Sequence, residues 1–191
     1  MPSIAEVLMF VTNRLSAHPE MDWIIVGSAA SLIQGCQQIQ PNDIDIMVKY
    51  SSDVNQITSL FMDYLSEISP SQLFNKHWFS SKCSPTYTMV LDKEVWSFAR
   101  LHIDGVNIEI SNTATHEYLE LSDVIWKIKR FQNYLDTLFP VVPLELQLHS
   151  SYVQDKPERI QAIKKVIRRN NLDLHFLKSY LTDSAYRQLT E

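Results

Sequence analysis

The sequence predicts an α/β protein (α+β), in which a small mixed β-sheet with flanking helices precedes an all-helical C-terminal region. Three observations predict this arrangement. Two apolar, β-forming runs flank a short helical segment between residues 23 and 48. An Asp-Gly dipeptide joins two strand-like segments near residue 104, and helical periodicity dominates after residue 116. We therefore expect a core domain at residues 1–115 and a helical region at residues 116–191.

The composition is that of an ordinary globular protein, with 45% hydrophobic and 20% charged residues among 191. The formal net charge of −5 argues against a nucleic-acid duplex as partner. No apolar run approaches the roughly 20 residues of a membrane span, so no membrane partner is expected, and the N-terminal stretch predicts an amphipathic helix instead of a signal peptide. Cys36 and Cys83 lack zinc-ligand and disulfide spacing, which favours a reduced, cytoplasmic setting.

The elements of the first part follow from hydrophobic periodicity. Apolar residues that recur every three or four positions predict helices, and apolar runs or alternation predict strands. The predicted helices cover residues 3–17, 28–34 and 53–65, and the predicted strands cover residues 23–26, 43–48, 87–91, 96–103 and 106–110. Gly35 suits the end of the second helix. Asp104-Gly105 is the strongest short-range signal for a hairpin.

The second part is predicted to be helical throughout. Residues 117–138 and 144–168 predict two helices separated by Pro140 and Pro143, and residues 172–189 predict a third. Pro157 is expected to break or kink the middle helix, because proline lacks a backbone donor and disfavours helix just before it. The basic cluster of the middle helix alternates with apolar residues, which predicts a solvated helix face.

Asp43 and Asp45 form the most informative local pattern. Alternate side chains of a strand share a face, so the two aspartates share one face, and Ile44 and Ile46 share the other. Positions two apart on a strand are roughly 6.6–6.8 Å apart, so both carboxylates can reach one hard cation. Glu109 occupies the polar face of a later strand. The alternatives are a solvated strand face for the aspartates and an exposed hairpin position for Glu109.

Three features together resemble the nucleotidyltransferase superfamily that includes DNA polymerase beta, and especially its small bacterial antibiotic-modifying or minimal members. They are Gly27-Ser28 before a helix, Asp43-x-Asp45 on a strand and Glu109 on a later strand, in the segments IIVGSAASLIQG, NDIDIMV and VNIEI. The resemblance implies transfer of a nucleoside monophosphate from an NTP to a hydroxyl of a small-molecule or protein acceptor, with release of pyrophosphate.

The resemblance also implies roles for these residues. Asp43, Asp45 and Glu109 would hold two Mg²⁺ ions that stabilise the attacking and leaving oxygens, or Glu109 would take the proton of the attacking hydroxyl. Gly27 would let backbone amides approach the triphosphate, and Ser28 would add a hydroxyl at a helix N-terminus.

One departure concerns the loop CQQIQPN between Gly35 and Asp43, which lacks the Arg or Lys that many members carry there. The triphosphate would therefore need cations from elsewhere. The candidates are Lys49, Lys127, Arg100 and Arg130. The alternative function is a nucleotidyltransferase-fold binding or antitoxin-type protein with little or no turnover on small molecules. The acceptor, the base of the NTP and the formation of a homodimer stay open.

Overall fold

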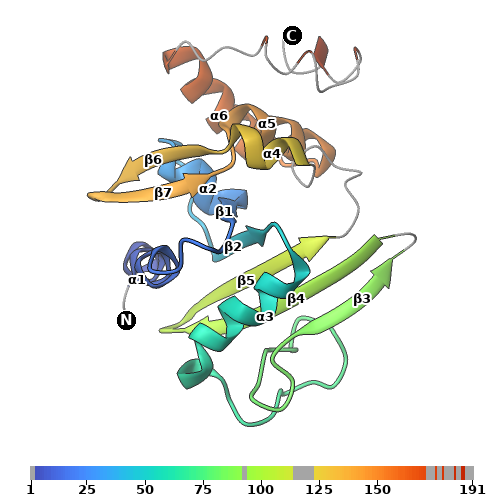
Figure 1. The fold of residues 1–191 in the computed structure, drawn as a ribbon. Coiled ribbons are helices and arrows are strands. Elements are labelled where there is room, and N and C mark those ends of the chain that lie inside the picture. The colour runs from blue at the N-terminus through green and yellow to red at the C-terminus, as the bar shows by residue number, and fades with distance from the viewer. Residues whose placement is uncertain are drawn as a thin grey trace. The chain divides into compact units, whose positions relative to one another are not determined.

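The computed structural model combines helices on and around β-strands in a mixed α/β architecture (Figure 1). It describes residues 3–91, 94–113 and 123–170, together with residues 175, 178, 183, 186 and 187. These residues form seven strands, and helices lie both between the strands in sequence and at the C-terminal end of the described chain. The mixed α/β class predicted from the sequence, with helices toward the C-terminal end, is confirmed.

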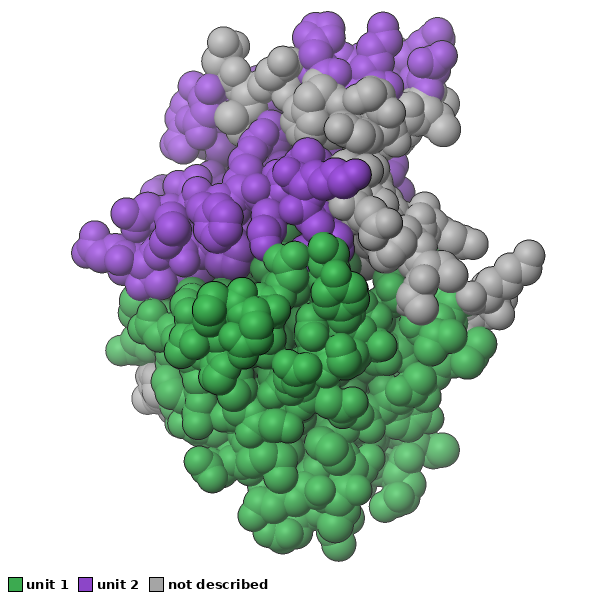
Figure 2. Space-filling view, viewed as in Figure 1, with its two compact units in different colours: residues 1–25, 41–115 green, residues 26–40, 116–191 purple. Residues whose placement is uncertain are grey.

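The chain divides into two compact units, which Figure 2 draws in two colours. Unit 1 comprises Met1–Ile25 and Pro41–Thr115, and unit 2 comprises Val26–Gln40 and His116–Glu191. The chain therefore leaves unit 1 at the end of its first strand and returns shortly before its second. The boundary predicted between residues 115 and 116 does not separate residues 26–40 from the first domain. The predicted division into domains stays a prediction.

Unit 1 contains helices and five strands. Ser3 begins its first helix with a capping box, in which the side chains of Ser3 and Glu6 each accept a hydrogen bond from the other residue's backbone N–H. The helices and strands predicted between residues 3 and 110 are confirmed to within a few residues at their ends. The elements are α1 (Ile4–Ser16), β1 (Trp23–Val26), β2 (Asp43–Val48), α3 (Ser51–Leu60), η1 (Met62–Tyr64), β3 (Tyr87–Leu91), β4 (Glu94–Ile103) and β5 (Val106–Thr113).

The strands of unit 1 lie in the order β3-β4-β5-β2-β1. β3, β4 and β5 are successive antiparallel neighbours, whereas β2 runs parallel to β5. Figure 1 shows β2, from early in the chain, beside β5, from much later. The sheet is therefore mixed, and its parallel pair joins two segments that carry the predicted carboxylates.

The turn between β4 and β5 is the predicted Asp104-Gly105 hairpin. Asp104 and Gly105 have φ values of 50° and 88°, and a type I′ turn requires positive φ at both central residues. The turn sets a register in which Ile103 pairs with Val106 and every later pair follows in step. The hairpin prediction is confirmed.

One face of the unit 1 sheet belongs to the hydrophobic core. The apolar alternate positions of β2 and β5 are fully buried, namely Ile44, Ile46, Ile108 and Ile110. α3 packs against β4 and β5 (Figure 1), and its Val54 and Ile57 are fully buried. Burial of this face fixes which way the polar alternates point, because side chains on a strand alternate between faces.

Unit 2 contains four helices and a hairpin within its described residues. They are α2 (Gly27–Ile33), α4 (Asp123–Ile128), β6 (Arg130–Tyr134), β7 (Thr137–Val141), α5 (Leu144–Val153) and α6 (Pro157–Asn170). The helix predicted over residues 117–138 was wrong beyond Ile128, because β6 and β7 form an antiparallel pair there. Residues 116–122 lie outside the described chain. This part of the protein is therefore not all-helical.

The break predicted near Pro157 is confirmed. α5 ends before Asp155, which has a φ of 50°, and Pro157 opens α6 at a position where its missing N–H is not needed. The helix predicted over residues 172–189 lies largely outside the described residues. Of the helices that are described, none has the length and apolar character needed to cross a membrane.

Candidate active site

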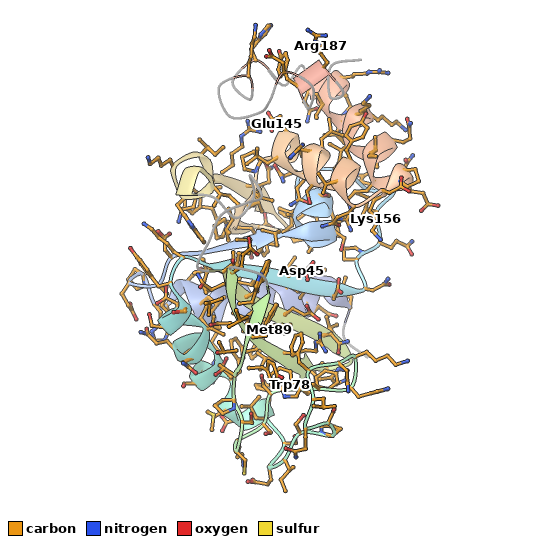
Figure 3. The ribbon with its side chains drawn as sticks, turned by 90° about the vertical axis from the view of Figure 1, so that its right-hand side faces the viewer. Asp45, Trp78, Met89, Glu145, Lys156 and Arg187 are labelled. Atoms are coloured by element: carbon orange, nitrogen blue, oxygen red, sulfur yellow. The ribbon has the colours of Figure 1, made fainter. Side chains whose placement is uncertain are left out.

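Asp43, Asp45 and Glu109 lie on one face of the unit 1 sheet. The parallel register of β2 and β5 pairs Asp43 with Asn107 and Asp45 with Glu109. Because alternate residues of a strand share a face, these four polar side chains project from the same side of two adjacent strands. Figure 3 labels Asp45 on β2. The pairing thus places residues from distant parts of the sequence beside one another.

The carboxylates are half-buried on a rigid support. Asp43, Asp45 and Glu109 are of intermediate exposure, while the isoleucines that alternate with them are buried. At the far end of β2, the buried Asn112 donates hydrogen bonds of 3.0 Å to the carbonyls of Val48 and Lys49. Asn112 therefore fixes the end of β2 against β5. No local sequence signal pointed to it, because its partners depend on strand pairing.

Arg100 extends this polar row onto a third strand. The antiparallel register of β4 and β5 pairs Arg100 with Glu109, and Arg100 Nε donates to Glu109 Oε1 at 2.7 Å. The row across β2, β5 and β4 is therefore Asp45, Glu109 and Arg100. The sequence offers Arg100 only as a candidate cation for the triphosphate, and in this structure its guanidinium binds the third carboxylate.

The donor set fits a magnesium ion. Carboxylate oxygens are hard ligands, and enzymes usually hold Mg²⁺ through one or two carboxylates plus substrate phosphates and water. Asp43 and Asp45 meet that requirement, whereas the Asn107 amide oxygen beside them lies 2.8 Å from His102 Nδ1. Among the described residues, no three His, Cys, Asp or Glu side chains are grouped closely enough to form a metal cage by themselves. Any ion here would take its remaining ligands from phosphate and water.

Gly27 and Ser28 lie in unit 2, at the start of α2. Gly27 has a φ of 68°, a conformation that favours glycine, and Ser28 is buried. With its amide oriented to satisfy both partners, the buried Gln147 exchanges two hydrogen bonds of 3.2 Å with the backbone of Gly27. Gln147 therefore supports the glycine turn and occupies its N–H, a role that the sequence did not reveal.

Two of the remaining candidate cations are engaged with carboxylates. Lys49 Nζ lies 3.7 Å from Asp22 Oδ2. Arg130 donates from both terminal nitrogens to the two oxygens of Glu145, at 2.8 Å each. Lys127 lies exposed in the last turn of α4. A nucleotide that recruited Lys49 would have to compete with Asp22, whereas Lys127 presents its ammonium group to solvent.

A small pocket of about 100 Å³ in unit 2 is lined by two further cationic side chains and by part of the loop that follows Gly35, which carries no Arg or Lys. Its lining includes Lys165 and Arg169 of α6, together with Gly35 and Cys36. Burial raises the pKa of the Cys36 thiol to about 11. Gly35 has a φ of 98°, and Arg169 Nη2 would lie only 3.3 Å from a Cβ atom at that position. The basic cluster of α6 is thus partly turned toward this loop and is not only a solvated face.

Comparison with known proteins bears on the fold. No protein-family model and no curated protein matches the chain. A candidate nucleotidyltransferase from Thermotoga maritima has a solved structure that matches with a TM-score of 0.58 at 20% identity, over 86% of this chain and 92% of that chain. This chain has a nucleotidyltransferase fold. The resemblance inferred from the sequence is therefore confirmed at the level of the fold.

Two further nucleotidyltransferase-type structures match with lower scores. An antigenic nucleotidyltransferase-like protein from Paracoccidioides brasiliensis has a TM-score of 0.48 and 14% identity, over 85% of this chain and 74% of that chain. The antibiotic-resistance factor ANT(2'')-Ia has a TM-score of 0.46 and 10% identity, over 96% and 89%. The structural argument for the nucleotidyltransferase fold rests on the Thermotoga match.

Proposed function

We propose that this protein transfers a nucleoside monophosphate from an NTP to a hydroxyl group of a small-molecule or protein acceptor and releases pyrophosphate. The observation that carries the proposal is the register that sets Asp45 directly beside Glu109, with Asp43 on the same face. Carboxylates on adjacent strands of a nucleotidyltransferase fold suit a divalent cation, through which the phosphates of an NTP would bind.

In this mechanism the carboxylates divide the work. Two Mg²⁺ ions, when bound, neutralise the triphosphate and stabilise the attacking and leaving oxygens. Asp43 and Asp45 would hold and orient the metal, whose positive charge would offset the repulsion between their carboxylates. Glu109 would help to hold the second metal or would accept the proton of the attacking hydroxyl. Because the carboxylates project from the paired strands β2 and β5, their oxygens are already positioned when the substrate binds.

The proposed nucleotide contacts are Gly27, Ser28, Lys49 and Lys127. Ser28 provides a hydroxyl at the start of α2, and Lys127 provides an exposed ammonium group. Lys49 contributes after exchanging Asp22 for a phosphate. Gly27 contributes by the bend that it allows more than by its N–H, which Gln147 occupies.

The test is a transfer assay with Mg²⁺ and each of the four α-³²P-labelled NTPs, with hydroxylated antibiotics and with co-encoded proteins as acceptors. We expect label on one acceptor, and Asp45→Asn should lower the rate by more than about 100-fold, beyond the roughly 10–100-fold cost of losing a residue that merely supports a metal ligand. Asp104→Asn is the matched control, because Asp104 is an exposed aspartate in the hairpin turn of the same sheet. Equal transfer by wild type and Asp45→Asn would contradict the proposal.

The second candidate is a nucleotide-binding or antitoxin-type protein with little or no turnover. Two observations favour it, namely the pairing of Glu109 with Arg100 and the occupation of the Gly27 N–H by Gln147. Such a protein would bind Mg²⁺ and NTP but release no pyrophosphate with any acceptor. Pyrophosphate release measured beside nucleotide binding separates the two functions.

A further inference from the structure

Arg100 contacts the third carboxylate and a distant segment of unit 1 at the same time. Its Nε donates to Glu109, and its Nη1 donates to main-chain carbonyls near Trp78. We infer that Arg100 is a positioning residue, which orients Glu109 for a divalent cation and couples the occupancy of that site to the segment of residues 75–80. The inference rests on the proposed function in one respect, namely that Glu109 faces a metal.

The anchoring of Arg100 is independent of Glu109. Its Nη1 donates to the carbonyl of Asn75 at 2.8 Å and to that of Trp78 at 3.2 Å. Its guanidinium carbon lies 5.3 Å from the ring centroid of Phe74. The main chain adds two more hydrogen bonds, from Arg100 N to Ser80 Oγ at 3.0 Å and from Ser80 N to Arg100 O at 2.9 Å. The guanidinium is therefore held in place before it meets the carboxylate.

The segment that holds Arg100 is itself fixed by aromatic packing. Phe74 contacts Tyr87 of β3 and Phe98 of β4, with ring centroids 5.0 and 4.8 Å apart. Trp78, which Figure 3 labels, is buried and lies 5.5 Å from Tyr87. These contacts place the segment over the sheet face that carries the carboxylates, since Phe98 alternates in step with Arg100 along β4.

The geometry leaves Glu109 able to bind a second cation. The hydrogen bond uses Nε and Oε1 only, so the pair is monodentate and the other carboxylate oxygen can face a metal. The side chain of Arg100 is 14% exposed, whereas that of Glu109 is 35% exposed. A planar guanidinium fixed on one side by carbonyls can hold a carboxylate in one orientation, and such partners of metal ligands usually contribute to metal affinity.

The proposed metal site and the segment of residues 75–80 are coupled because the Arg100 guanidinium contacts both. A cation that draws on Glu109 changes the charge facing Arg100, and Arg100 bonds directly to the carbonyls of Asn75 and Trp78. Metal binding should therefore change the protection of backbone amides in residues 75–80, including Ser80, whose N–H bonds to the Arg100 carbonyl.

The experiment measures Mn²⁺ affinity of the full chain by electron paramagnetic resonance, without nucleotide. We expect Arg100→Gln to weaken binding by about tenfold and Arg100→Lys, which keeps the charge, to weaken it less. In the Glu109→Gln background Arg100→Gln should have no further effect, because the two residues act as one unit. Arg14→Gln is the matched control, because the Arg14 guanidinium also lies over aromatic rings of unit 1, those of Phe10 and Phe61.

Amide hydrogen exchange gives the second readout. Mn²⁺ should change the exchange of residues 75–80 in the wild type. This change should disappear in both Arg100→Gln and Arg100→Lys, because neither side chain has the planar guanidinium with its several fixed donors. Unchanged Mn²⁺ affinity in both Arg100 variants, or equal losses with and without Glu109, would overturn the inference. Mn²⁺ binding that is insensitive to Asp45→Asn would instead overturn the metal site itself, so the two failures are distinguishable.

Discussion

Two arginine–glutamate pairs in this protein differ in which partner is buried. In unit 1 the side chain of Arg100 is 14% exposed and that of Glu109 is 35% exposed. In unit 2 the exposure is reversed, with Arg130 at 40% and Glu145 at 0%. The first pair is joined by one hydrogen bond and the second by two.

The difference fits the proposal that Glu109 is a functional acid, whereas Glu145 is a structural one. Glu145 lies fully inside unit 2, and its two oxygens are both bound by Arg130, so it has no access to a ligand. Glu109 has a second oxygen and reaches solvent, so it can exchange partners. A buried carboxylate depends on its cation for stability, because an unpaired buried charge is costly. A half-exposed carboxylate depends on it far less.

Loss of the unit 2 pair should have the largest effect on stability. Arg130→Ala leaves Glu145 buried without its guanidinium, and breaking a buried pair in this way costs about 3–5 kcal/mol. Urea denaturation of the full chain measures this cost. Arg168→Ala, which removes an exposed arginine from α6, should change the free energy of unfolding by less than about 0.5 kcal/mol. Equal stability of the two variants would remove the distinction between the pairs.

Substitution of the half-exposed Glu109 should instead affect catalysis. Glu109→Gln keeps the shape of the side chain and removes its charge, so we expect turnover to fall by about 10²–10⁴-fold, the usual contribution of an acid–base group. The free energy of unfolding should fall less than in Arg130→Ala, because Glu109 is partly exposed and Arg100 keeps its hydrogen bonds to the carbonyls of Asn75 and Trp78. The comparison fails if Glu109→Gln unfolds the protein or leaves turnover intact.

Asp53 sharpens the comparison, because it is a buried acid whose Oδ2 has no hydrogen-bond partner within the described structure. Burial raises its pKa, although the Tyr50 backbone and a hydrogen bond from the Ser52 hydroxyl act in the opposite direction. As pH rises above the unfolded value of about 3.9, the unfolded chain loses this proton first. The stability contributed by Asp53 therefore falls until pH passes the folded pKa and then stays level.

Asp53→Asn should accordingly be more stable than the wild type near neutral pH, and the difference should shrink as pH approaches 4. The gain should be smaller than the loss in Arg130→Ala, because Asp53 also benefits from its place in the first turn of α3. Melting temperatures measured from pH 4 to pH 8 test the sign. A variant that is less stable at neutral pH would contradict it.

The smallest expected effect concerns the reactivity of the two cysteine thiols. Cys36 is buried and has a pKa raised to about 11, whereas Cys83 is exposed. Iodoacetamide at pH 8 should therefore add one group to the native chain, at Cys83, and a second only after denaturation. Peptide mass mapping identifies the site. Rapid labelling of Cys36 in the native protein would show that the loop beside α6 opens.

The two hairpins show how far the sequence predicts the fold. Asp104-Gly105 and Leu135-Asp136 both have positive φ at two successive residues, but only the first contains the glycine by which such turns are recognised. The second also follows a segment whose apolar spacing matches a helix. The helix predicted there does not form, because β6 and β7 pair as strands. Local periodicity cannot reveal such pairing.

The candidate site shows the same division. Alternation on β2 and β5 predicted which faces Asp43, Asp45 and Glu109 share, because that depends only on the period of a strand. The partners of those faces could not be predicted. Arg100, Gln147 and the Lys49 pairing with Asp22 all depend on strand register or on segments far apart in the sequence.

The most direct test of the proposed metal and nucleotide site is calorimetric titration with an α,β-methylene NTP analogue, with and without Mg²⁺. The analogue cannot be cleaved at the reacting bond, so binding is measured apart from turnover. We predict binding to the wild type and to Asp104→Asn only when Mg²⁺ is present, and none to Asp45→Asn. Binding that is independent of Mg²⁺, or equally tight in Asp45→Asn, would contradict the assignment of this sheet face.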